Sequence, residues 1–156
     1  MDQVVKALGV ALADERHALA TYNAVLVRFG DVRPFVNIAD AEQRHIDALL
    51  RLYQRYDVPV PDDQTIIADE THTMDLASLC QSGMDGEIEN FRLYDEELLP
   101  AVSDYPDITS VLRALRDASA NNHLPAFRRC VVRGDCGGQS AGLGGRRRRR
   151  HRGGQG

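Results

Sequence analysis

Apolar residues recur three and four positions apart along most of this chain, and this spacing predicts amphipathic helices. The first helix is predicted from about residue 2 to 29, where one continuous apolar stripe runs along a single face. Gly30 ends that stripe, and Pro34 is suited to the first turn of a second helix that reaches to about residue 56.

The second half of the chain repeats this arrangement. A third helix is predicted from a capping Thr73 to a stop at Pro100, and a fourth from about residue 106 to 133. Pro125 lies inside the fourth helix, cannot donate a hydrogen bond to the carbonyl of Asn121, and is expected to kink the helix there.

Between the two halves lies a linker of roughly fifteen residues that opens with Pro59 and Pro61, which is long for a turn in a bundle. Such a length suits a crossover between two helical hairpins. The sequence therefore predicts an all-α antiparallel four-helix bundle over residues 1–133, followed by a disordered Gly/Arg-rich tail over 134–156.

Charge is distributed unevenly along the chain. Its net charge is −4, but Arg146 to Arg150 and Arg152 lie in the tail, and removing these six positive charges leaves −10 on the rest. We expect the acidic body not to attract nucleic acid, whereas the tail would bind polyanions without sequence preference. The tail is interpreted either as a flexible arm or as the product of a frameshift in the gene.

The cysteines and the hydropathy bear on location. Cys80, Cys130 and Cys136 show no Cys-x-x-Cys spacing, and their odd number argues against a disulfide framework. Cys80 and Cys130 are therefore expected to be small buried apolar residues. No segment has the roughly 20 apolar residues that span a membrane, and the amino terminus lacks a signal-peptide pattern, so a cytoplasmic location is expected.

A few polar residues interrupt the apolar stripes at matching places in the two halves. In each half a glutamate is followed seven residues later by a tyrosine, and a histidine lies on the next helix. These residues are Glu15, Tyr22 and His45 in the first half, and Glu87, Tyr94 and His123 in the second. Carboxylates and imidazoles on buried helix faces indicate a metal site inside the bundle.

Glu42 and His45 are three residues apart and therefore project from the same helix face. Carboxylates can bridge and neutralise two cations, and imidazole suits borderline metals, so this mixture favours iron or manganese over calcium. Glu87 is preferred to Glu89 because Glu87 has the same tyrosine spacing as Glu15. His17 is expected to face solvent.

The stretches 13–22, 35–45 and 122–127 resemble the ferritin-like superfamily, related to rubrerythrin, and most closely an uncharacterised family of small bacterial ferritin-like domains. The resemblance covers roughly residues 5 to 130 and is most specific at Glu42 to His45. It implies a ferritin-like bundle with a di-iron or di-manganese site. The metal ligands that it implies are Glu15, Glu42, His45, Glu87 and His123.

The chain departs from the two-metal pattern at Ala120, three residues before His123, where a second Glu-x-x-His would require a glutamate. Three carboxylates then face two divalent ions, and a bridging hydroxide could supply the remaining charge. A mononuclear site stays an equal alternative. Tyr22, Tyr94 and Asn122 are expected to surround the ligands and to donate hydrogen bonds to them.

The expected function is redox chemistry of the metal centre with O2 or peroxide, as an oxidoreductase, a peroxidase or a ferroxidase. A rubredoxin-like Cys-x-x-Cys module is absent, so a separate electron donor is expected, and a homodimer is one expected assembly. The alternative is a non-catalytic bundle with a degenerate metal site that serves as a protein-interaction module.

Overall fold

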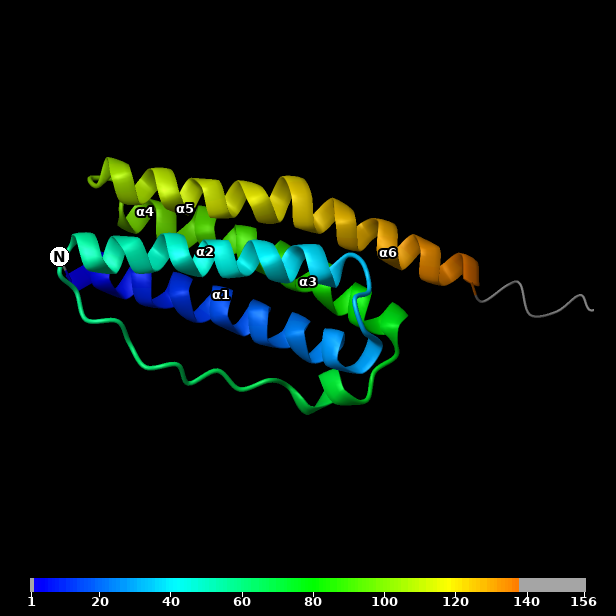
Figure 1. Cartoon of the computed structure of the whole chain (residues 1–156). Helices are drawn as coiled ribbons and strands as arrows, with labels where there is room; N and C mark the ends of the chain where they lie inside the picture. The colour runs from blue at the N-terminus through cyan, green and yellow to red at the C-terminus, as the bar shows by residue number, and fades with distance from the viewer. Residues whose placement is uncertain (1, 138–156) are drawn as a thin grey trace, which may run out of the picture.

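The structure is a computed structural model that describes residues 2–137, with side chains described as far as residue 134. This part of the chain is helical apart from its connections (Figure 1). Helix α1 spans Asp2–Phe29 and α2 spans Phe35–Arg55, close to their predicted limits. Gly30 ends α1 with a backbone φ of 74°, a conformation that glycine adopts without strain.

The third and fourth helices are each interrupted by a π-helical turn. The third consists of α3 (Leu76–Leu93), the π-helical segment η2 (Tyr94–Leu98) and the short α4 (Leu99–Ala101). The fourth consists of α5 (Pro106–Ala118), the π-helical segment η3 (Ser119–His123) and α6 (Leu124–Gly137). The prediction of an all-α four-helix bundle is confirmed. The predicted boundary after residue 133 falls inside α6, and residues 138–156 of the predicted tail lie outside the described residues.

Two predicted helix ends differ from the structure. The cap of α3 is Asp75 and not Thr73, because the Asp75 side chain accepts a hydrogen bond from the backbone N–H of Ser78 at 2.8 Å. The third helix also continues through Pro100 to Ala101.

The π-helical turns explain how the helices tolerate their prolines. In η2 the N–H of Leu99 bonds to the carbonyl of Tyr94, and in η3 the N–H of Leu124 bonds to the carbonyl of Ser119. Each turn ends two residues before a proline, Pro100 or Pro125. A proline removes one donor from the helical ladder, and the wider turn changes the pairing just before that position. The disturbance predicted near Asn121 is therefore a π-helical turn.

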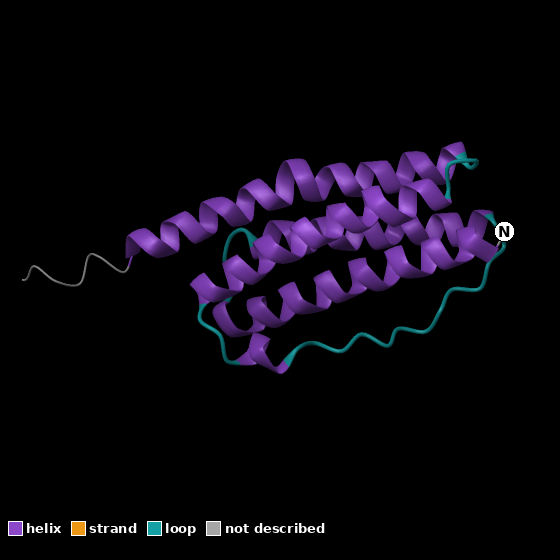
Figure 2. Cartoon of the chain, turned by 180° about the vertical axis from the view of Figure 1, so that it is seen from behind, coloured by secondary structure: helices purple, strands orange, loops and turns teal. Residues whose placement is uncertain are grey.

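The direction of the helices accounts for the long connection. Helix α2 runs antiparallel to α1, whereas α3 runs in the same direction as α2, so the chain must return along the whole bundle (Figures 1 and 2). This crossover follows α1 and includes the short 3-10 helix η1 (Asp69–His72). Arg16 holds it by donating to the carbonyl of Pro61 at 2.9 Å, and Arg28 by donating to the carbonyls of Thr71 and Met74.

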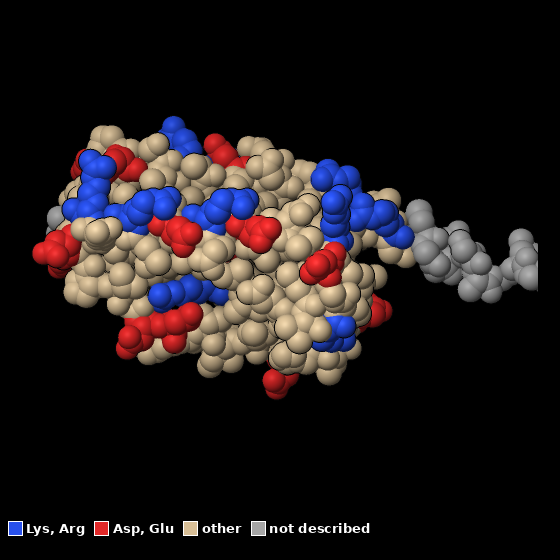
Figure 3. Space-filling view, in the orientation of Figure 1, with Lys and Arg blue, Asp and Glu red and all other residues tan. Residues whose placement is uncertain are grey.

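The core consists of two apolar clusters with a polar layer between them, formed by Glu15, Glu42, His45, Glu87 and His123. One cluster contains Val4, Leu8 and Leu12 of α1 with Leu112 and Leu115 of α5. The other contains Phe35 and Phe127, at the opposite end of the bundle. Acidic and basic side chains are interspersed on the face in Figure 3. None of the helices among residues 2–137 is long and apolar enough to cross a membrane.

Cys80 and Cys130 are buried, as expected, but they form a disulfide that joins α3 to α6. The expectation of two unpaired apolar residues is therefore wrong. Cys80 lies seven residues before Glu87, and Cys130 lies seven residues after His123. Because α3 and α6 run antiparallel, equal offsets from two facing residues bring the cysteines opposite each other.

Candidate metal centre

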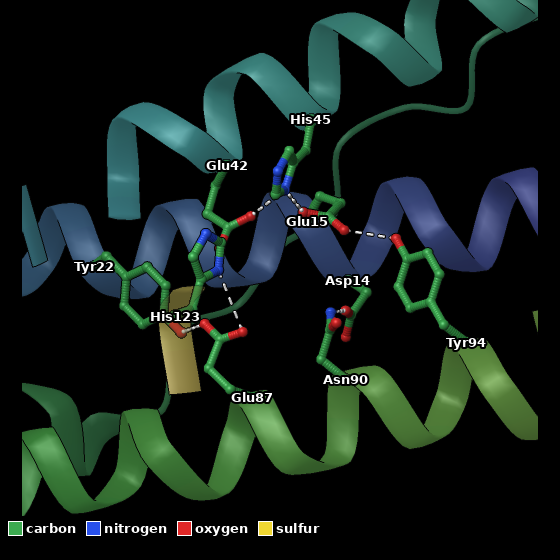
Figure 4. Close-up of polar contacts among 9 residues, drawn as sticks. All are labelled: Asp14, Glu15, Tyr22, Glu42, His45, Glu87, Asn90, Tyr94 and His123. Atoms are coloured by element: carbon green, nitrogen blue, oxygen red, sulfur yellow. Dashed lines mark hydrogen bonds and ion pairs between the residues drawn. The ribbon is translucent and has the colours of Figure 1, made fainter. Parts of the chain in front are cut away.

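Two glutamates in the polar layer come from α1 and α3 and are tied to each other's helix. Tyr22 of α1 donates a hydrogen bond to Oε1 of Glu87 at 2.8 Å, and Tyr94 of η2 donates to Oε1 of Glu15 at 2.6 Å (Figure 4). Each tyrosine thus reaches the glutamate of the opposite helix and leaves the second carboxyl oxygen, Oε2, for the interior. Glu15 is 1% exposed and Glu87 is 3% exposed.

Helix α2 places Glu42 and His45 against these residues. The Nδ1 atom of His45 lies 2.9 Å from Oε2 of Glu42 and 3.0 Å from Oε2 of Glu15. On the other side, the Nδ1 atom of His123 lies 3.2 Å from Oε1 of Glu42 and 3.3 Å from Oε2 of Glu87. The two imidazole rings stack with their centroids 5.6 Å apart.

These five residues form two groups of potential metal ligands, and the groups share one carboxylate. Glu15, Glu42 and His45 form the first group, and Glu42, Glu87 and His123 form the second. Within each group the ligand atoms lie within 4.8 Å of one another. Glu42 faces the first histidine with one oxygen and the second histidine with the other, which is the arrangement of a bridging carboxylate.

The protonation of the metal-free residues reflects their burial and their crowding. Burial raises the pKa of Glu15 to about 8. Burial would lower the pKa of His45 and of His123, but the carboxyl groups beside them raise these values to about 9 and about 10. Burial would also raise the pKa of Glu42, but its contacts with both histidines lower it below its usual range. Without a cation, protons supply the positive charge that this layer needs.

His123 lies where a metal ligand could act. Its side chain is 4% exposed, and its Nδ1 atom lies at ion-pair distance from the carboxyl groups of Glu42 and Glu87 but has hydrogen-bond geometry to neither. A cation held between these groups could be bound by the imidazole and by both carboxylates. Oxygen and imidazole donors together suit iron or manganese.

Other residues of the polar layer were predicted less well. The Asn122 side chain is exposed, so the expectation that it contacts the ligands is wrong: it precedes His123 by one residue and projects from a different side of the helix. A hydrogen bond from Asn90 of α3 to Asp14 of α1 was not predicted from the sequence. Burial raises the pKa of Asp14 to about 6. The position of Asn90, three residues after Glu87, was the available signal.

Comparisons with known proteins agree with this fold. The crystal structure of a hypothetical protein from Methanococcus jannaschii DSM 2661 is similar, with a TM-score of 0.72 and 21% sequence identity over 84% of this chain and 81% of the other. At this identity the likeness concerns the fold alone. A search of curated proteins finds no match. Residues 8–139, which include all five candidate ligands, match the family described as "Uncharacterized protein domain (DUF2202)", and the chain belongs to this family.

Proposed function

We propose that this protein is a ferritin-like, rubrerythrin-related metalloprotein that holds two iron ions, or two manganese ions, in its polar layer. Glu15 and His45 would bind one ion, Glu87 and His123 the other, and Glu42 both. Such a centre supplies redox chemistry with O2 or peroxide. The proposed activity is that of an oxidoreductase, a peroxidase or a ferroxidase.

The position of Glu42 is the observation that carries this proposal. Its oxygens lie 2.9 Å from one histidine nitrogen and 3.2 Å from the other, so a single side chain belongs to both ligand groups. A carboxylate that offers one oxygen to each ligand group could bridge two cations. The Nδ1 atom of His123 supports the same interpretation, because it lies between the carboxylates of Glu42 and Glu87 without hydrogen-bond geometry to either.

The test is the metal content of the full chain, loaded anaerobically with Fe(II) and measured by mass spectrometry. We expect about two irons per chain, and a large loss in Glu42→Ala/His45→Ala. The matched control is Glu97→Ala/His72→Ala, which removes an exposed glutamate and an exposed histidine and should leave the iron content unchanged. Circular dichroism would show that all three proteins are helical.

The outcome separates the two functions that the sequence leaves open. Iron retained by the wild type and the control but lost by the Glu42→Ala/His45→Ala variant justifies assays of peroxide and O2 consumption with an added electron donor. About one iron per chain would indicate a mononuclear centre, and a folded chain without iron or manganese would refute the proposal. That last result favours the non-catalytic interaction bundle.

The electron donor, a homodimer and polyanion binding by the tail remain proposals. So does the cytoplasmic location, and the disulfide between Cys80 and Cys130 weighs against it because disulfides are rare in cytosolic proteins.

A further inference from the structure

A cavity of about 880 Å³ lies between α1 and α3, beneath the segment that joins the crossover to α3. It reaches from the exposed side chains of His17, Asp85 and Glu89 to the buried carboxylates of Glu42 and Glu87. It therefore connects the surface of the bundle with the candidate metal centre.

Small residues of α3, among them Ser78, Ser82 and Gly86, leave space in this wall. A Cβ atom built on Gly86 would meet no other atom within 4 Å. The tyrosine–glutamate hydrogen bonds described above hold α1 and α3 at a fixed separation on either side of this space.

The cavity reaches the two ligand groups unequally. Glu87 and the shared Glu42 are among its lining residues, together with Tyr22, whereas Glu15 and His45 are not. A molecule in the cavity would therefore lie beside Glu42 and Glu87, and the two ligands that belong to the first group alone would not face it.

The two ends of the cavity differ in polarity. Along α1 it extends from Asp14 to Val25, roughly 16 Å at the rise of an α-helix. Around Val25 the walls are apolar and include Phe35 and Leu79. At the other end Asn90 donates a hydrogen bond to the carboxyl group of Asp14, and the Oδ1 atom of Asn90 has no hydrogen-bond partner.

The charges and the size of the cavity restrict what it can bind. Besides the proposed ligands Glu42 and Glu87, its lining residues include the acidic Asp14, Asp85 and Glu89 but neither lysine nor arginine, which disfavours carboxylates and phosphates. Peroxide would occupy on the order of 60 Å³, twice the share of one water molecule, whereas pockets that bind organic ligands typically measure roughly 300–1,000 Å³. The volume of this cavity lies in the range of such pockets.

We propose that this cavity binds a small organic amine as the substrate of the metal centre, with its ammonium group at Asp14 and Asn90 and its apolar body toward Val25, Phe35 and Leu79. The middle of such a molecule would pass Glu42 and Glu87. That the amine is a substrate rests on the proposed function, but its binding to the cavity can be tested independently of the metal.

The test measures binding of n-decylamine to the full chain by calorimetry, because its extended chain is long enough to reach from Asp14 to the apolar end of the cavity; decanoate is the anionic probe of similar size. We expect the amine to bind with a dissociation constant in the millimolar range or below, and decanoate at least tenfold more weakly. Gly86→Phe would fill the cavity and weaken amine binding at least tenfold. Ala114→Phe adds the same ring at an exposed position of α5 and should not affect binding.

Metal content is measured on the same samples, so that the two proposals can fail separately. Amine binding that is absent in the wild type, equal for decanoate, or unchanged in Gly86→Phe would overturn the cavity assignment even if two irons are bound. Amine binding without any iron would refute only the metal centre.

Discussion

Replacing Gly83 by alanine should destabilise the bundle, whereas the same change three residues later should stabilise it. A Cβ atom on Gly83 would lie 2.6 to 2.9 Å from three ring atoms of Phe127. That ring cannot retreat freely, because it is fully buried and its centroid lies 5.4 Å from that of Tyr22 and 5.2 Å from that of Phe35. Overpacking of this kind costs about 1–3 kcal/mol.

Gly86 provides the matched comparison within the same helix. Both substitutions gain about 1 kcal/mol from the better helix propensity of alanine, but an added Cβ on Gly86 meets nothing. We therefore expect Gly86→Ala to raise the free energy of unfolding by about 1 kcal/mol. Gly83→Ala should be less stable than Gly86→Ala by about 1–3 kcal/mol, or very roughly 3–10 °C in Tm for a domain of this size.

Urea unfolding of the metal-free proteins, followed by circular dichroism, gives both values. Phe127→Leu should remove most of the difference between the two alanine variants, because it removes the ring that the new Cβ would meet. Equal stability of Gly83→Ala and Gly86→Ala would refute the reasoning, since it would show that the contact with Phe127 does not limit the size of residue 83.

Two further predictions concern the polar layer itself. Tyr22→Phe and Tyr94→Phe each leave a buried carboxyl oxygen without its donor and should each lower the free energy of unfolding by about 1–3 kcal/mol, measured by urea unfolding; changes below about 0.5 kcal/mol would contradict this. Metal binding should also release protons. Glu15, His45 and His123 have pKa values of about 8, 9 and 10 in the metal-free protein, so all three are protonated at pH 7 and must lose their protons to bind metal. Affinity should therefore rise between pH 6 and 8, and calorimetry in buffers of different ionisation enthalpy should detect about three protons per loaded chain; no release would contradict these pKa shifts.

Hydrophobic periodicity was sufficient to predict the four helices. The stripe of the first helix extends over its full length, so both ends of α1 agree with the prediction. The π-helical turns could not be predicted in this way, because shifting a hydrogen bond by one residue leaves the sequence pattern almost unchanged. Pro100 and Pro125 signalled a disturbance in the helix, but not whether the helix would end, bend or widen there.

The polar layer was predictable because charged residues inside apolar stripes are rare. This signal was enough to find Glu15, Glu42 and Glu87, which are all buried. It could not show which tyrosine contacts which glutamate, because that depends on the relative placement of α1 and α3. For the same reason the disulfide and the Asp14–Asn90 contact were missed, since both join segments that only the folded bundle brings together.

The repeat in the sequence also explains why the two ligand groups differ. The tyrosine–glutamate pairs are exchanged symmetrically between α1 and α3, but Glu42 has no counterpart, since Ala120 occupies the matching place before His123. One carboxylate must therefore serve both histidines, which draws Glu42 to the centre of the layer. Besides the shared Glu42, the cavity borders Glu87 but neither Glu15 nor His45. On the proposed function, Glu87 and His123 would hold the ion whose ligands lie nearer the cavity, and Glu15 and His45 would hold an ion whose own ligands do not line it.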